Sequence, residues 1–553
     1  MPDLRLLEAE PTDAERVAID AVLGAAAAQE ARTLRDDRTK RHLLLPALRA
    51  AQQRVGWVSE GALGYASRRL AVPPAEAYGV ASFYALIALE ERPADVTHVC
   101  TDLSCMLRGA SVPPGAHPSP CLGLCERAPA SYRTLAGEQP VEEQIPEAGP
   151  PLPQAGDASL RLLRRISAGV DPESIDAYLE AGGFESLARA RELGAETVLA
   201  EVVSSRLLGR GGAAFPTGAK WEAVARQPAQ PHYVVCNADE SEPGTFKDRV
   251  LMEQDPFALV EAMAIAGLAT GSSTGFIYVR AEYPLAHRRL QNAIDLARSR
   301  GLLGGFEIEL RIGAGAYVCG EETALFASIE GFRGEPRNKP PFPVEVGLFG
   351  MPTAVNNVET LFNVLDVVAE GGAGFAATGT EASTGTRLFC VSGCVGRPGL
   401  YELPFGTTLR HLLELAEAES PKAVLLGGAA GAFVGPELLD LRLTYEDTRA
   451  AGVTLGSGVV IVYDENADLV AAVLRIAEFF RDESCGQCVP CRVGTVRQQE
   501  ALHRLAAGRP HENELQTLAE LAQVMRDASI CGLGQTAANA VASAISNLGV
   551  FAA

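Results

Sequence analysis

Four cysteines near the C-terminal end constrain this chain more than any other feature. Cys485, Cys488 and Cys491 stand at Cys-x2-Cys-x2-Cys spacing in Glu-Ser-Cys-Gly-Gln-Cys-Val-Pro-Cys, and Cys531 follows in Ser-Ile-Cys-Gly-Leu-Gly. Three thiolates on one tight loop and one distant thiolate are typical of a 4Fe–4S cluster. Disulfides suit this spacing poorly, whereas a structural zinc site with four cysteines and unliganded thiols are the alternatives. The pattern favours a protein that transfers single electrons.

A second cysteine set, nearer the N-terminus, consists of two close pairs. Cys100 and Cys105 follow an apolar run at Cys-x4-Cys spacing, and Cys121 and Cys125 follow a proline-rich loop at Cys-x3-Cys spacing. Two pairs on loops suit a 2Fe–2S cluster, in which each iron takes two thiolates. Zinc and a degenerate site are the alternatives. The other cysteines match no ligand pattern and are expected to be core thiols: Cys236, Cys319, Cys390 and Cys394.

Length and charge exclude several classes of partner. The chain has 553 residues, which is enough for several domains, and a net charge of −21, which argues against binding to nucleic acid or an anionic membrane surface. The most apolar stretch, residues 257–279, is interrupted by Glu261 and a Gly-Ser-Ser turn, which predicts no direct membrane insertion. Patterned cysteines without a secretory signal predict a cytoplasmic protein, with any attachment to the inner membrane made through partner subunits.

Residue patterns predict a multidomain α/β and α+β fold. Leu44, Leu48, Ala51 and Val55 keep helical spacing, and Gly56 is expected to end their helix. Apolar runs at 233–236 and 276–279 are typical of buried strands. The expected parts are a helical region (1–92), a small cysteine-bearing domain (93–135), a linker rich in Gly, Pro, Glu and Gln (136–158), an α/β domain (159–384), an α+β module (385–465) and a helical region holding the 4Fe–4S cluster (466–553).

A glycine-rich segment at residues 209–221 lies between two expected helices. Its closely spaced glycines let backbone N–H groups approach a phosphate, and Arg210 and Lys220 can balance the phosphate charge. The segment is not a P-loop, because Ala219 separates Gly218 from Lys220 and no Ser or Thr follows the lysine. An ordinary glycine turn is the alternative.

Two polar loops follow expected strands of the α/β domain. Residues 237–244 (Asn-Ala-Asp-Glu-Ser-Glu-Pro-Gly) lie where open α/β sheets bind ligands, although a solvated acidic turn is the alternative. Residues 313–318 begin like a dinucleotide-binding fingerprint but carry Val318 in place of the third glycine. Glu321 and Glu322 then open a helix, where acidic residues are commonly caps.

Together these segments resemble the NADH-binding flavoprotein subunit of respiratory complex I. The matching pieces keep the family's order and spacing over roughly residues 159–553: residues 209–221, 237–244, 315–325 and 483–495. Residues 20–130 resemble the thioredoxin-like 2Fe–2S subunit of the same complex, through Gln-Gln-Arg-Val-Gly-Trp-Val, Tyr-Gly-Val-Ala-Ser-Phe-Tyr and the cysteine pairs. The chain thus resembles a fusion of the two, as in the diaphorase subunits of NAD-dependent hydrogenases and formate dehydrogenases.

The resemblance implies cofactors and residues that bind them. It implies an FMN held by Gly209, Arg210, Gly211, Gly212, Lys220, Asn237, Asp239, Glu240, Tyr317, Gly320, Glu321, Asn356 and Asn357. It implies an NADH whose adenine stacks between Phe215 and Phe342, with Lys339, Glu322 and the candidate catalytic residue Glu242 nearby. It also implies a Rossmann-like FMN/NADH domain and a ubiquitin-like module of the SLBB type at 385–465. Only fifteen residues separate Cys105 from Cys121, so the thioredoxin-like domain is expected to be abbreviated.

The function that the resemblance implies is that of an NADH dehydrogenase. NADH would transfer a hydride to FMN, and single electrons would pass through the 4Fe–4S centre, with the 2Fe–2S centre taking the second electron, to an iron–sulfur partner subunit of a quinone-reducing respiratory complex. The alternatives are a diaphorase of a hydrogenase or formate dehydrogenase, and an electron-transfer scaffold without flavin. Acidic residues near the nucleotide favour NADH over NADPH, because they repel a 2′-phosphate.

Overall fold

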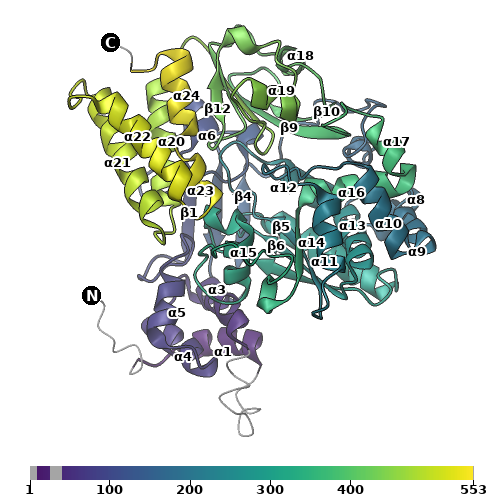
Figure 1. The fold of residues 1–553 in the computed structure, drawn as a ribbon. Helices are drawn as coiled ribbons and strands as arrows, with labels where there is room; N and C mark the ends of the chain where they lie inside the picture. Colours follow the sequence, from purple (N-terminus) through teal and green to yellow (C-terminus); the bar gives the residue numbers. More distant parts are fainter. Residues whose placement is uncertain (1–8, 25–39, 552–553) are drawn as a thin grey trace.

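A computed structural model describes residues 9–24 and 40–551 (Figure 1). Its N-terminal part is a group of helices: α1 (Asp13–Leu23), η3 (Arg41–Leu43), α3 (Leu44–Val55), α4 (Glu60–Arg69) and α5 (Pro74–Ala81). α1 begins at a capping box, in which Thr12 and Glu15 each accept the other's backbone N–H. α3 ends at Gly56, which has a φ of 100°, as the sequence predicted.

The small cysteine-bearing domain is a four-stranded sheet in the order β2-β1-β3-β4. Its elements are β1 (Asp95–Cys100), α6 (Leu103–Leu107), β2 (His117–Ser119), η4 (Cys125–Arg127), β3 (Ser131–Leu135) and β4 (Val141–Ile145). β1 pairs parallel with β2 and antiparallel with β3. β4 lies inside the stretch 136–158 that was predicted as a linker. Its Pro, Gly and Glu content concealed an edge strand, which pairs with β3 from Ser131↔Ile145 to Leu135↔Val141.

The α/β domain is built on a parallel sheet in the order β7-β6-β5-β8. Its strands are β5 (Tyr233–Ala238), β6 (Thr274–Val279), β7 (Glu307–Ile312) and β8 (Thr353–Asn357). Its helices are α7 (Arg164–Ser167), α8 (Ile175–Glu180), α9 (Glu185–Leu193), α10 (Ala195–Ser204), α11 (Thr217–Ala225), α12 (Lys247–Gln254), α13 (Pro256–Thr270), α14 (Pro284–Ser299), η5 (Tyr317–Gly320), α15 (Glu322–Ile329), η6 (Leu348–Gly350), α16 (Val358–Glu370) and α17 (Gly372–Ala376).

Alternate residues of β5 face two different hydrophobic cores. Val234 and Cys236 pack into the core formed with α13, α14 and α16, whereas Val235 packs with α15 and the N-terminal helices. Both faces of the sheet are therefore covered, which explains why its strands read as continuous apolar runs. The cover also leaves the carboxyl ends of the strands as the place where a ligand can enter.

The C-terminal third consists of an α+β module and a helical bundle (Figure 1, green and yellow). The module has a mixed sheet in the order β10-β9-β13-β11-β12, formed by β9 (Thr386–Gly393), β10 (Gly399–Pro404), β11 (Ala423–Leu426), β12 (Ala432–Val434) and β13 (Val459–Tyr463), with α18 (Leu409–Leu415), η7 (Pro436–Leu438) and α19 (Tyr445–Ala450). The bundle contains α20 (Leu469–Asp482), α21 (Val489–Ala506), α22 (Glu514–Ala528), α23 (Gly532–Thr536) and α24 (Asn539–Leu548). No helix within residues 9–24 and 40–551 has the length and apolar character that a bilayer crossing requires.

Candidate functional site

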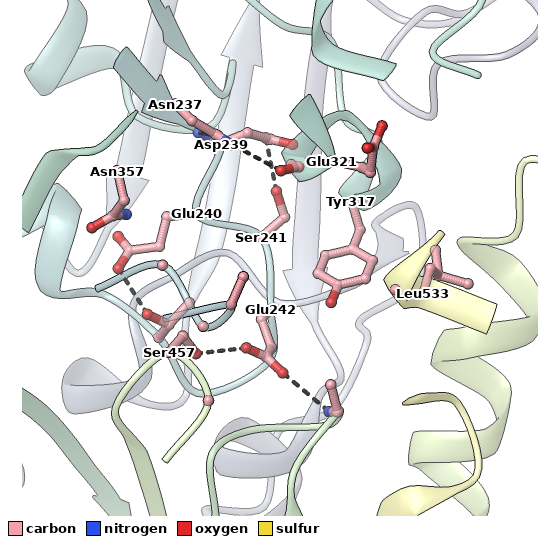
Figure 2. A pocket seen from close by; sticks show the side chains of 18 of the residues that line it. Asn237, Asp239, Glu240, Ser241, Glu242, Tyr317, Glu321, Asn357, Ser457 and Leu533 are labelled. Atoms are coloured by element: carbon pink, nitrogen blue, oxygen red, sulfur yellow. Dashed lines mark hydrogen bonds between the residues drawn. The ribbon is translucent and has the colours of Figure 1, made fainter. Parts of the chain in front are cut away.

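A cavity lies at the carboxyl end of β5, where the α/β domain, the module and the bundle meet (Figure 2). Its two parts, of about 370 and 690 Å³, share lining residues such as Gly211, Asn237 and Gly320. The residues predicted to bind FMN or NADH all line one part or the other, with the exception of Arg210. The structure therefore brings together segments that are far apart in the sequence.

The glycine loop between α10 and α11 closes on itself and forms one wall of the cavity. The backbone N–H of Gly209 donates to the carbonyl of Phe215 at 2.9 Å. Gly212 has a φ of 117°, and a Cβ there would lie 3.6 Å from the carbonyl carbon of Gly456 in the module. The positive φ of Gly212 requires glycine at this position, because residues with a Cβ rarely adopt that backbone conformation.

The side chain of Arg210 stabilises this loop through hydrogen bonds to backbone carbonyls. The side chain is fully buried, and its guanidinium donates to the carbonyl oxygens of Leu208 (2.9 Å), Thr384 (2.7 Å) and Thr386 (3.2 Å). It also lies 4.7 Å from the ring centroid of Phe405. Arg210 does not line either part of the cavity, and both of its terminal nitrogens are bonded to backbone carbonyls, so the structure gives no support to the prediction that this guanidinium balances a phosphate charge.

Two lysines and two glutamates form a charged row along the larger part of the cavity. The Lys339 Nζ lies 2.9 Å from Glu321 Oε1 and 2.7 Å from Glu322 Oε1, and the Lys220 Nζ lies 3.8 Å from Glu322 Oε2. Burial alone would raise the pKa of Glu322, but the two lysines hold it below its usual value. Glu321 also accepts from the first N–H groups of α15, so the capping interpretation applies to it.

Two aromatic rings line the same part of the cavity and remain open to solvent. Phe215 is 54% exposed and Phe342 is 52% exposed. The Lys220 Nζ lies 5.8 Å from the centre of the Phe215 ring. Exposed rings on a cavity wall are suited to stacking with a planar base, as the resemblance implied for adenine.

The end of β5 and the loop after it place polar groups in the wall of the smaller part (Figure 2). Asn237 Nδ2 donates to the carbonyl of Gly320 at 2.7 Å, and Ser241 Oγ donates to Asp239 Oδ1 at 2.8 Å. The other carboxylate oxygen of Asp239 is buried and makes no hydrogen bond within the described residues. Burial raises the pKa of Asp239 to about 8. A buried carboxyl oxygen left without a partner in a cavity wall fits a ligand that carries a complementary polar group.

Glu240 and Glu242 both use their carboxylates inside the protein. Glu240 accepts the backbone N–H groups of Asp248 (2.9 Å) and Arg249 (2.8 Å) and so caps α12. Glu242 accepts from Ser457 Oγ at 2.5 Å and from the Ala430 N–H at 3.0 Å. The predicted catalytic assignment of Glu242 is therefore not supported, because both of its oxygens join the loop to the α+β module.

The two asparagines at the end of β8 differ in their roles. Asn356 Oδ1 accepts from Trp221 Nε1 at 3.2 Å, while its buried Nδ2 makes no hydrogen bond within the described residues. Asn357 caps α16 and accepts from the Nζ of Lys247 at 3.2 Å. Lys247 is 1% exposed and lines the cavity beside Asp248, 2.7 Å from its Oδ1. Sequence reasoning missed this lysine, which follows the recognised loop by only three residues.

Further cavity residues come from parts of the chain that sequence reasoning assigned to other roles. The module and the start of α23 supply lining residues: Gly427, Ala430, Thr454, Gly456, Ser457, Gly532, Leu533 and Thr536. Gly427 and Gly456 belong to the α+β module, and nothing local in the sequence relates them to the glycine loop. Their place in the wall follows from the packing of the module on the α/β domain.

The four C-terminal cysteines line a separate small cavity next to the main cavity. Cys485, Cys488, Cys491 and Cys531 face it from the start of α21 and the start of α23, and no His, Asp or Glu lines it. Among residues 9–24 and 40–551, no three His, Cys, Asp or Glu groups are placed to hold a single ion. Four thiols around a cavity, without other donors, fit a 4Fe–4S cluster, which is larger than one ion.

The cavity lined by the C-terminal cysteines is separated by a thin wall from the smaller part of the main cavity, which we call the flavin-sized cavity. Val318 and Leu533 line both of them. Tyr317, the residue before Val318, lines the smaller part of the main cavity, and its backbone N–H donates to Glu483 Oε2 at 2.8 Å. Its ring centroid lies 5.0 Å from that of Phe479. The site therefore joins the start of the cysteine loop to the wall of the cavity through directly packed groups.

The four N-terminal cysteines are buried where two cores meet: Cys100 and Cys105 belong to a small core of their own, and Cys121 and Cys125 to the core of the α/β domain. Cys100, Cys105 and Cys121 are each 2% exposed, Cys125 is 5% exposed, and the Sγ atoms of Cys121 and Cys125 lie 3.4 Å apart. The small core also contains Leu122, Leu124, Ala130 and Tyr132. Four clustered thiols among apolar side chains fit a 2Fe–2S cluster.

Comparison with known protein families follows the same division of the chain. The family models that match are "Nuo51 FMN-binding domain" over residues 202–366, "NADH-ubiquinone oxidoreductase-F iron-sulfur binding region" over 471–549 and "Thioredoxin-like [2Fe-2S] ferredoxin" over 30–112. The last match begins outside the described residues and ends before Cys121.

Sequence relatives match a longer, continuous part of the chain than the family models do. The NADH-quinone oxidoreductase-F protein of Aquifex aeolicus is 43% identical over 394 residues, which is 69% of this chain and 91% of that protein. The chain belongs to the NADH-quinone oxidoreductase-F family. The NADP-reducing hydrogenase subunit HndC of Solidesulfovibrio fructosivorans is 43% identical over 397 residues, which is 69% of this chain and 81% of that protein. As a member of the oxidoreductase-F family, the chain is an oxidoreductase with an FMN-binding domain, a 4Fe–4S region and a thioredoxin-like 2Fe–2S domain, as predicted.

A solved structure covers more of the chain than the oxidoreductase-F sequences do. The match is to a chain of an NAD⁺-reducing [NiFe]-hydrogenase in the H₂-reduced state, with 33% identity and a TM-score of 0.79, over 93% of each chain. The same enzyme type in the air-oxidized state gives a TM-score of 0.79 at 32% identity. The predicted multidomain architecture is confirmed.

Proposed function

We propose that this chain oxidises NADH through a bound FMN and passes single electrons to a partner subunit of a multi-subunit redox complex. The observation that carries the proposal is the wall formed by Val318 and Leu533, which separates the flavin-sized cavity from the cavity lined by the C-terminal cysteines. FMN supplies the chemistry, because it accepts a hydride and releases electrons one at a time.

The protein groups bind and orient. Phe215 and Phe342 hold the base of the nucleotide, and the row of Lys339 and the two glutamates positions its sugar and phosphates. Asp239 offers a buried carboxyl oxygen and Asn356 a buried N–H donor, both without partners among the described residues, which suits the polar edge of a flavin. No side chain is required as a nucleophile.

The test is analysis of purified protein together with activity. The holoprotein is expected to contain flavin, iron in both cluster types and no stoichiometric zinc, and to reduce ferricyanide with NADH. Colourless protein without flavin absorbance, or cysteine sites that hold zinc, would contradict the proposal and would favour a flavin-less scaffold.

A structural match supports a second candidate, a hydrogenase-type diaphorase in place of a subunit of a quinone-reducing complex. The chain from an NAD⁺-reducing hydrogenase covers 93% of this chain in structure, while in sequence the hydrogenase subunit HndC and the relative from Aquifex aeolicus each match 69% of it. The partner is then a hydrogenase, or the formate dehydrogenase that the same fusion also suits, and any membrane contact is made through partners. Co-purification from the native host distinguishes them: hydrogen- or formate-dependent NAD⁺ reduction supports a diaphorase, and NADH-dependent quinone reduction contradicts it.

A further inference from the structure

Arg280, at the carboxyl end of β6, joins the N-terminal cysteines to the cavity wall. Its side chain is 3% exposed. One guanidinium nitrogen donates to the carbonyl of Cys121 at 2.7 Å, and another donates to the carbonyl of Glu240, also at 2.7 Å. The first nitrogen also lies 2.8 Å from Glu282 Oε1. A single buried cation therefore touches both the loop that carries two cysteines and the loop that lines the flavin-sized cavity.

A second buried arginine approaches the same cysteine loop. Arg249 is fully buried, and its Nε donates to the carbonyl of Gly123 at 2.9 Å. Its other nitrogens pair with Glu253 at 2.8 Å and with Glu126, the residue after Cys125. The charge of Arg249 is shared with two carboxylates, whereas Arg280 is paired with one. Arg280 is therefore the less compensated cation beside the cysteines.

Resting on the proposed function, we infer that Arg280 sets the reduction potential of the 2Fe–2S centre, as a positioning residue that acts through the Cys121 loop. Reduction adds one negative charge to a cluster held by four buried thiolates. A buried cation nearby stabilises that added charge, and the low polarity of the surroundings strengthens the effect. Glu282 opposes it, because its carboxylate offsets the charge of Arg280.

Two substitutions should therefore shift the potential in opposite directions. Arg280→Gln removes the cation and is expected to lower the midpoint potential of the 2Fe–2S centre, and Arg280→Lys, which keeps the charge but not the fork of donors, should lower it less. Glu282→Gln leaves Arg280 uncompensated and is expected to raise the potential. A role confined to stability would not produce shifts of opposite sign.

The measurement is a potentiometric titration of the purified holoprotein followed by EPR. The 4Fe–4S signal of each variant serves as an internal reference and should keep its potential. Arg69→Gln is the matched control, since Arg69 is also buried, pairs with Asp20 and donates to the Gly24 carbonyl, but belongs to the N-terminal helices.

The titrations distinguish failure of the inference about Arg280 from failure of the proposed function. A 2Fe–2S signal whose midpoint is the same in wild type, Arg280→Lys and Glu282→Gln overturns the inference, while the proposed function stands. Absence of any 2Fe–2S signal from wild-type protein overturns both. If Arg280→Gln fails to assemble, the opposite shifts of Arg280→Lys and Glu282→Gln still support the inference, and their absence refutes it.

Discussion

The carboxylate of Glu242 accepts a 2.5 Å hydrogen bond from the hydroxyl of Ser457, 215 residues further along the chain. Its second oxygen accepts the N–H of Ala430, so the side chain ties the α+β module to the loop after β5. Close packing supports the contact, because a Cβ at Gly428 would lie 2.5 Å from the carboxyl carbon of Glu242. The module is thereby held as one wall of the cavity.

Removal of this link should loosen the module and the cofactor together. Glu242→Ala deletes two hydrogen bonds to a half-buried carboxylate and is expected to lower stability by about 2–3 kcal/mol and to release flavin on gel filtration. The thermal unfolding midpoint and the flavin-to-protein ratio measure the effect. Glu437→Ala changes an exposed glutamate of the same module and should have no effect. Full flavin retention by Glu242→Ala would show that the link is dispensable.

Loss of an aromatic ring from the cavity should weaken nucleotide binding. Phe342→Ala removes one stacking surface and is expected to raise the KM for NADH roughly tenfold, which corresponds to about 1.4 kcal/mol, with a smaller effect on kcat. Steady-state ferricyanide reduction provides both values. Phe349→Ala is the control, because Phe349 is also partly exposed but does not line the cavity. Equal KM values for the two variants would contradict the stacking role.

The charged row should discriminate against NADPH. Glu322 lies on the cavity wall, and its pKa is held below the usual value by two lysines, so it stays ionised at neutral pH. We expect at least about tenfold lower kcat/KM for NADPH than for NADH, and a smaller ratio for Glu322→Gln, because a like charge is removed. Comparable efficiency of the wild-type protein with both nucleotides would refute the assignment. The test has weight because one relative is named an NADP-reducing hydrogenase subunit.

The C-terminal cysteines should act as one set. Cys531→Ser removes the ligand that is distant in sequence, and the protein is expected to lose the iron and the EPR signal of the 4Fe–4S centre while it keeps those of the 2Fe–2S centre. Cys394→Ser is the control, since Cys394 is partly exposed and belongs to neither set. A 4Fe–4S signal that survives in Cys531→Ser would exclude Cys531 as a ligand.

Glu240 should make the local stability of α12 depend on pH. Burial, with a smaller contribution from Asp248, raises its pKa from 4.5 to about 7. The folded protein therefore binds more protons than the unfolded chain between these values, and stability falls as the pH rises through this window, by roughly 2 kcal/mol. Hydrogen exchange of α12 amides, corrected for intrinsic rates, should show the fall between pH 5 and pH 8. Glu240→Gln should flatten it, and an equal slope in that variant would contradict the assignment.

Local sequence signals predicted the elements and the two cysteine sets. The spacing of Cys485, Cys488 and Cys491 is a property of one loop, and the apolar run at β5 reflects burial on both faces of one strand. The linker prediction was less successful, because the pairing of β4 with β3 depends on a partner strand and not on its own composition.

The cavity itself depended on contacts that no short segment records. Arg210 carries the charge expected of a phosphate ligand, yet its direction is set by the carbonyls of Thr384 and Thr386, more than 170 residues away. Lys247 and Ser457 line the cavity because α12 and the module pack around it. The residue type predicts the chemistry of each side chain, whereas the fold determines which groups that side chain contacts.

The burial of the N-terminal cysteines has a consequence for how the protein is made. All four are sealed between β9, where Ser392 bonds to Ser104 of α6, and the arginines that hold the Cys121 loop. Thiols buried this deeply are shielded from iron and sulfide in solution once these surfaces have closed. We therefore expect the cluster to enter before the module and the α/β domain close around the four cysteines.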